Sequence, residues 1–123
     1  MTRHNLQNLT VEGLVQAFVT SALGQCEAEL EDAISRYNLL RKQMIGIEQE
    51  LKHRPGDQRR ALVALYDHRN AHVRLMAAIA TLALAPEKAR QTLQLISDRN
   101  EYPDAADARG MLRALDQGTY KPS

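Results

Sequence analysis

The segment from Val73 to Leu84 is apolar at every position except Arg74 and Thr81. A surface helix carries one apolar stripe, whereas a helix that is apolar on all its faces is buried between neighbours on several sides. The segment therefore predicts a helix over 71–85 at the centre of the domain. Asn70 is a suitable N-cap for this helix, and Pro86 fits the first position of the next one.

The rest of the chain also favours helices. Ala and Leu are the commonest residues, Val and Ile together number only 10, and Trp is absent. Ala and Leu lose little side-chain entropy in a helix, whereas strands favour β-branched and aromatic residues. Apolar residues recur at steps of three and four, and no segment sustains a period of two. The sequence thus predicts an all-α fold of about six helices.

Capping and helix-breaking residues bound these helices. Thr10 caps the first, Gly24 separates it from the second, and Pro55 with Gly56 ends the second. The six helices are expected over about Val11–Leu23, Gln25–His53, Asp57–Tyr66 and Ala71–Ala85, from Pro86 onward, and from Tyr102-Pro103-Asp104 to Gly118.

The long second helix has one apolar stripe at steps of three and four. The stripe consists of Cys26, Leu30, Ile34, Tyr37, Leu40, Met44, Ile47 and Leu51. Acidic residues precede basic ones along it, which complements the helix dipole. Two ion pairs at a spacing of four residues are expected, Asp32 with Arg36 and Glu48 with Lys52.

A chain of 123 residues fits one domain, 1–123. We expect an N-terminal helical hairpin over 11–53, two helix pairs over 57–117 and a tail over 118–123. The lone Cys26 excludes an internal disulfide and is expected to be a packed core thiol. No signal peptide is evident, and the longest mainly apolar stretch, of about 14 residues, is shorter than the roughly 20 that cross a bilayer. The expected compartment is the cytoplasm, without membrane association.

Residues 65–82 resemble a HEAT repeat, which has a turn Asp, a Val-Arg pair opening its second helix and an Ala-rich run ending in Leu. The matching residues are Asp67, Val73, Arg74, Ala77, Ala78, Ala80 and Leu82. A weaker second copy has Asp98 and Arg109 in the corresponding places. The resemblance implies a short right-handed α-α superhelix, in which Asp67, Arg74, Asp98 and Arg109 tie the repeats together.

Taken whole, the chain is similar to a small bacterial family of unknown function. The segments that carry this similarity are Arg36-Tyr37-Asn38, residues 54–60, the Val73-Arg74 helix and residues 106–110. The similarity implies architecture only.

Arg74 is the charged residue of an otherwise apolar helix. Its guanidinium is expected to reach Asp67, Asp98 or turn carbonyl groups, because a planar fork of donors can join several acceptors. The alternative is a contact with an anion or a partner at the helix N-terminus.

A basic run surrounds the loop after the second helix. Lys52, Arg54, Arg59 and Arg60 stand there against one acid, Asp57. We expect one exposed basic patch and take these four cations as candidate partner-binding residues. An acidic protein and nucleic acid would both fit such a patch, but the net charge of +1 and the absence of interleaved aromatic residues disfavour nucleic acid. The identity of the protein partner stays open.

Two spacings are compatible with metal ligation. Glu50 and His53 form a Glu-x-x-His motif, but a di-iron bundle needs a second copy, which the sequence lacks. His68 and His72 lie four apart near Asp67, but a helix is expected to begin between them. A solvated helix end and a polar turn are the favoured interpretations. No metal, cofactor or catalytic residue is therefore predicted.

These patterns favour a non-enzymatic protein-protein interaction module, because helical stacks present extended surfaces. The alternative is an immunity protein that neutralises a bacterial toxin, by analogy of fold. A nucleic-acid-binding protein and an enzyme are less favoured, since no acids, bases or metal ligands must converge. Exposed ends of a short stack are compatible with a homodimer.

Overall fold

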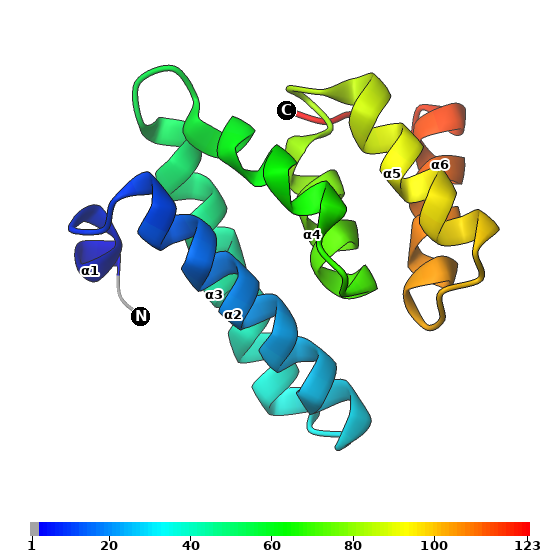
Figure 1. Cartoon of the computed structure of the whole chain (residues 1–123), viewed down its shortest axis with the longest axis horizontal. Coiled ribbons are helices and arrows are strands. Elements are labelled where there is room, and N and C mark those ends of the chain that lie inside the picture. Colours follow the sequence, from blue (N-terminus) through cyan, green and yellow to red (C-terminus); the bar gives the residue numbers. More distant parts are fainter. Residues whose placement is uncertain (1–2) are drawn as a thin grey trace. The chain divides into compact units, whose positions relative to one another are not determined.

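The computed structural model describes residues 3–123 and is built from helices alone in that range, which confirms the all-α prediction (Figure 1). The helices are α1 (Arg3–Gln7), α2 (Val11–Leu30), α3 (Ile34–His53), the 3₁₀-helix η1 (Gln58–Asp67), α4 (Ala71–Thr81), α5 (Pro86–Asp98) and α6 (Asp104–Gln117). Among these described residues, no helix combines the length and the apolar character that crossing a membrane requires.

The chain divides into two compact units, Met1–Ala61 and Leu62–Ser123. The boundary falls inside η1, a few residues beyond the expected division between the hairpin and the helix pairs. The organisation as a single domain stays a prediction.

In the first unit, α2 and α3 form an antiparallel hairpin, and α1 packs against α3 (Figure 1). Thr10 caps α2 as predicted, since its hydroxyl oxygen accepts a hydrogen bond from the amide of Gly13 at 3.0 Å. Long side chains from both helices fill the space between them. The fully buried apolar ones are Leu14, Phe18, Met44, Ile47 and Leu51.

The predicted boundary between the first two long helices is wrong. Gly24 lies inside α2, and the turn falls at residues 31–33 instead. Asp32 ends α2 in the left-handed region, with φ 56°, and Ala33 donates to the carbonyl of Ala28 at 2.7 Å. This is the hydrogen-bond pattern of a Schellman motif, with an aspartate where glycine is usual.

Gly24 has a packing role in place of a terminating one. A Cβ atom at this position would lie 3.0 Å from Cδ1 of Leu40 on α3. The missing side chain therefore lets α2 and α3 approach closely, and the helix continues through it because glycine inside a helix costs only about 1 kcal/mol.

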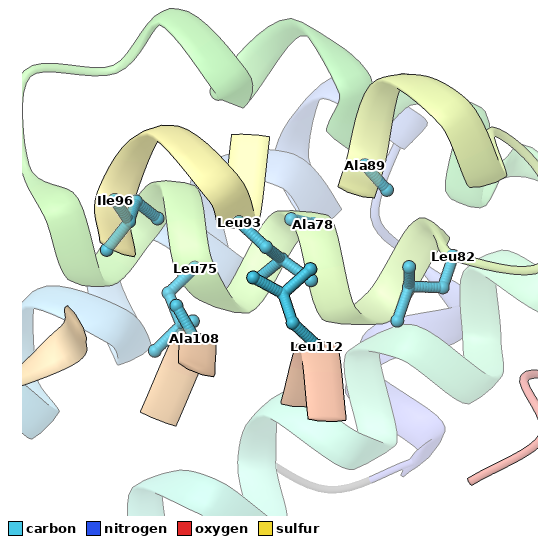
Figure 2. Packing of buried hydrophobic residues seen from close by; sticks show 8 residues of the cluster. All are labelled: Leu75, Ala78, Leu82, Ala89, Leu93, Ile96, Ala108 and Leu112. Carbon is cyan, nitrogen blue, oxygen red and sulfur yellow. The ribbon is translucent and has the colours of Figure 1, made fainter. Parts of the chain in front are cut away.

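The core of the second unit is a cluster of eight buried residues from α4, α5 and α6 and from Leu82, which directly follows α4 (Figure 2). The members are Leu75, Ala78, Leu82, Ala89, Leu93, Ile96, Ala108 and Leu112. Most of α4 is buried, as its apolar faces predict, including His72 and Thr81.

Local capping chemistry is confirmed at three ends in this unit. The Asn70 side chain accepts from the amides of His72 and Val73, Pro86 is the first residue of α5, and Gly118 ends α6 with φ 73°. The predicted extension of α4 to Ala85 is wrong. The helix stops at Thr81, and residues 82–84 form a turn in which the amides of Leu84 and Ala85 both bond to the carbonyl of Thr81. Pro86 accounts for the non-helical conformation of Ala85 alone. The segment after Asp57 is a 3₁₀-helix in place of the α-helix that its spacing suggests.

Candidate functional site

Arg54, a member of the predicted basic patch, is bound to its own chain. Its Nε donates to Glu50 Oε2 at 2.9 Å, and its Nη2 donates to the carbonyl oxygens of Leu6 at 3.2 Å and Leu9 at 2.6 Å. The guanidinium thereby joins the end of α3 to α1 and to the segment that links α1 to α2. Glu50, from the Glu-x-x-His motif, is accordingly an ion-pair partner of arginine.

Arg59 is buried and pairs with Asp57, and its charge also acts on Glu48. Its Nε and Nη2 donate to Asp57 Oδ1 at 2.9 Å and Oδ2 at 2.7 Å, and this hydrogen bonding lowers the pKa of Asp57. Burial raises the pKa of Glu48, although the charges of Arg41 and Arg59 act in the opposite direction. Glu48 pairs with Arg41 at 3.5 Å, whereas the sequence suggested Lys52.

The four cations of the predicted patch therefore do not form one exposed basic surface. Arg60 is exposed and donates to the carbonyl of Gly56 at 3.0 Å, Lys52 and Arg54 are half-buried, and Arg59 is buried. Counting charges along a sequence does not reveal which cations are paired within the fold. The part of these residues in partner binding stays a prediction.

Arg74 is held by a carboxylate that the sequence did not single out. Its Nη1 lies 2.8 Å from Glu101 Oε2, its Nη2 lies 3.0 Å from Glu101 Oε1, and its Nε donates to the carbonyl of His68 at 2.7 Å. The expected contact with a turn carbonyl is present, but Glu101 takes the place of Asp67 and Asp98. The Asp98 carboxylate accepts from Gln94 at 2.9 Å.

Arg109 joins α6 to the end of α5 and does not pair with Asp98. It donates to Ser97 Oγ at 2.9 Å, to the Ser97 carbonyl at 2.8 Å, to Asn100 Oδ1 at 2.6 Å, and to the hydroxyl of Tyr102. These contacts lie within the last helix pair, so Arg109 closes the turn between α5 and α6.

A buried pair joins the starts of α4 and α6. Nδ1 of His72 lies 2.7 Å from Oδ1 of Asp104, and both residues are buried. His68 has a different role, since its Nδ1 accepts from the amide of Asn70 at 3.0 Å. Within residues 3–123, no three potential ligands gather as a metal site would require. The polar-turn interpretation fits His68, whereas His72 lies inside α4 and is buried against Asp104.

The end of the α2–α3 hairpin is a candidate site whose exposed apolar side chains the sequence did not indicate. The side chains of Leu30 and Ile34 are 89% and 68% exposed, although their spacing had placed both on the inward stripe of one long helix. The stripe is interrupted because the chain reverses between them. Leu23 and Leu39 are also exposed on the same two helices.

A small pocket of about 200 Å³ lies at this end of the hairpin, which we call the hairpin-end pocket. It is lined by Ala28, Glu29, Asp32, Ala33, Ile34 and Tyr37. Its walls are thus mainly apolar, and two of the six residues bring carboxylates.

The carboxylates around this pocket differ in whether a cation of the same chain pairs with them. Arg36 pairs with Glu27 at 3.2 Å and with Glu31 at 3.5 Å, whereas the sequence suggested Asp32 as its partner. The side chains of Glu29 and Asp32 form no hydrogen bond or ion pair with any residue that the structure describes. The pocket therefore offers two uncompensated negative charges beside exposed apolar side chains.

Comparison with known proteins gives two matches of different kinds. Residues 12–116 match the family model of DUF2019, a domain of unknown function. The crystal structure of the protein RPA1889 from Rhodopseudomonas palustris CGA009 is similar to this chain at 45% sequence identity, with a TM-score of 0.94 over 96% of this chain and 98% of that one. Among curated proteins, none matches.

Proposed function

The chain belongs to the DUF2019 family, and we propose that it is a non-enzymatic interaction module that binds another protein through the end of its α2–α3 hairpin. The proposal includes the expectation that the helices after residue 57 form HEAT-like pairs, an architecture that serves protein binding in repeat proteins.

The exposure of Leu30 and Ile34 is the observation that carries this proposal. Burying a fully exposed Leu or Ile side chain in an interface contributes up to about 1.5–3 kcal/mol to the free energy of binding. Exposed side chains of this kind therefore favour association with a partner that covers them. Adjacent apolar side chains beside a pocket are typical of the central part of a protein interface.

The charges at the pocket define the chemistry of the partner. Among the residues that the structure describes, Glu29 and Asp32 have no cationic partner, whereas Glu27 and Glu31 share Arg36. A Lys or Arg side chain of a partner would place its aliphatic stem against Ile34 and its charge near these two carboxylates. The partner is therefore a protein with a basic residue next to apolar ones.

A second copy of this chain fits the same surface poorly. Two hairpin ends placed together would bring Glu29 and Asp32 of one copy against the same carboxylates of the other. Like charges at close range oppose association, so we expect a different protein as the partner.

The test is site-specific photo-crosslinking in the source organism, with the crosslinking amino acid at position 34. The expected product joins this chain to one other protein through a peptide that contains Lys or Arg. The purified partner is then titrated calorimetrically against the doubly substituted chain Glu29→Lys/Asp32→Lys. This variant is expected to weaken binding at least about tenfold, since it replaces two attractions by two repulsions.

Glu12→Lys is the matched control, because it reverses an exposed carboxylate at the other end of α2. It should leave the affinity within about twofold, as charges farther apart than a Debye length are screened. Unchanged binding by the double variant, or a crosslink between two copies of this chain, contradicts the proposal. A bacterial toxin as the crosslinked partner would identify the module as an immunity protein.

A further inference from the structure

The second unit contains a cavity to which the proposed function assigns no role. It has a volume of about 390 Å³ and lies between the loop before α4 and the exposed side of α5. The residues of its wall that matter here are Tyr66, Asp67, His68, Arg69, Leu95 and Arg99. Its size is in the range of sites for small organic molecules.

Two arginines of this cavity form no ion pair with the residues that the structure describes. Arg69 and Arg99 are both exposed, and neither side chain forms a hydrogen bond or ion pair with residues 3–123. Arg74 also lines the cavity but is neutralised by Glu101. Asp67 is the single carboxylate among the lining residues. The two free guanidinium groups therefore give the cavity a positive potential that attracts anions.

The other walls supply an uncharged donor and an apolar surface. Because Nδ1 of His68 accepts from the Asn70 amide, the proton of the neutral ring is assigned to Nε2, which is a donor available to a ligand. The Tyr66 hydroxyl is bonded to Thr81, so Tyr66 contributes its ring to the cavity. Leu95, 48% exposed, adds an aliphatic surface.

We infer that this cavity binds a small organic phosphate monoester, with Arg69 and Arg99 holding the phosphate oxygens. Guanidinium groups match phosphate geometry with paired donors, and two of them bring two positive charges to the double negative charge of a monoester. The ring of Tyr66 and the side chain of Leu95 contact the organic part of the ligand. Asp67 repels the phosphate and therefore limits the affinity for it.

Phenyl phosphate is a suitable probe, titrated calorimetrically at low ionic strength into the whole chain. The double variant Arg69→Ala/Arg99→Ala is expected to weaken its binding at least about tenfold, because each lost bond joins charged partners. Asp67→Asn is expected to strengthen it. All three side chains are exposed, so the variants should keep the circular dichroism spectrum and thermal midpoint of the wild type.

Arg113→Ala is the matched control, since Arg113 is an exposed arginine of α6 outside the cavity wall. Equal weakening by this control would show unspecific attraction and would overturn the inference. Inorganic phosphate binding as tightly as phenyl phosphate would exclude an organic ligand. Phenylacetate binding as tightly would exclude selection of phosphate. No binding at about 10 mM phenyl phosphate, well above a weak millimolar Kd, also overturns the inference.

Discussion

Arg74 and Glu101 form a two-point ion pair across 27 positions of the chain, with nitrogen-oxygen distances of 2.8 and 3.0 Å. The pair joins the start of α4 to the connection between α5 and α6. The remaining Nε of Arg74 donates to the carbonyl of His68 in the preceding loop. One side chain thus fixes two connections of the second unit, and its guanidinium is mostly shielded from water.

Arg74→Ala is expected to lower the free energy of unfolding by about 1–3 kcal/mol, because it leaves Glu101 and a carbonyl group without their donor. Arg74→Lys should restore only part of this loss, since an ammonium group cannot reproduce the planar fork. Urea denaturation followed by circular dichroism measures both. Arg113→Ala, an exposed control, should stay within about 0.5 kcal/mol of the wild type. An unchanged midpoint in Arg74→Ala would show that the pair contributes nothing to stability.

Most of the helical architecture could be predicted, because helix formation here follows local rules. The side chains of Thr10 and Asn70 act within three residues of themselves, and Gly118 needs only its own backbone freedom. The first turn could not be predicted in this way. Gly24 has the terminating residue type, but its use is decided by Leu40, sixteen positions later.

The candidate sites were less predictable, because they depend on tertiary pairing. A lone charge on an apolar helix singles out Arg74 in the sequence, but nothing near it in sequence points to Glu101. Leu30 and Ile34 are four apart, so the apolar rhythm continues unbroken across a point where the chain reverses. Their spacing therefore predicts core residues, although the turn at Asp32 leaves both of them exposed.

Two helical glycines should respond differently to alanine. Gly110→Ala in α6 is expected to raise the free energy of unfolding by about 0.5–1 kcal/mol, because a Cβ there meets no atom within 4 Å. Gly24→Ala should gain less or lose stability, because its Cβ would lie 3.0 Å from Cδ1 of Leu40. Thermal denaturation of the two variants side by side measures the difference. Equal gains would show that Leu40 gives way at no cost and that close helix packing does not require Gly24.

Two neighbouring arginines of the basic run, Arg59 and Arg60, should differ in their contribution to the free energy of unfolding. Arg59→Ala is expected to lower the free energy of unfolding by about 1–3 kcal/mol, since it removes a buried partner of Asp57 and a charge near Glu48. Arg60→Ala should change it by less than about 0.5 kcal/mol, because Arg60 is exposed. Urea denaturation of both variants is the measurement. A larger effect at Arg60 would reverse this assignment of the structural role.

Glu48 makes the free energy of unfolding depend on pH, because burial raises its pKa. Burial raises its pKa above the ordinary value of 4.5, so the folded protein holds this proton to higher pH than the unfolded chain does. The stability that protonated Glu48 contributes is therefore present below about pH 4.5 and is lost as the pH rises through the raised pKa. The Glu48→Gln variant has no ionisable group at this position, so its stability does not fall in this way as the pH rises.

The difference in free energy of unfolding, Glu48→Gln minus wild type, is thus expected to increase from about pH 4 to about pH 7. Urea denaturation at several pH values measures it. Asp57→Asn provides a control of opposite sign, because the pKa of Asp57 is lowered from 3.8 and its contribution is lost only as the pH falls through that lower value. Its destabilisation relative to wild type should therefore be larger at neutral pH than at acidic pH. A Glu48→Gln difference that stays constant with pH would mean that burial does not raise the pKa of Glu48.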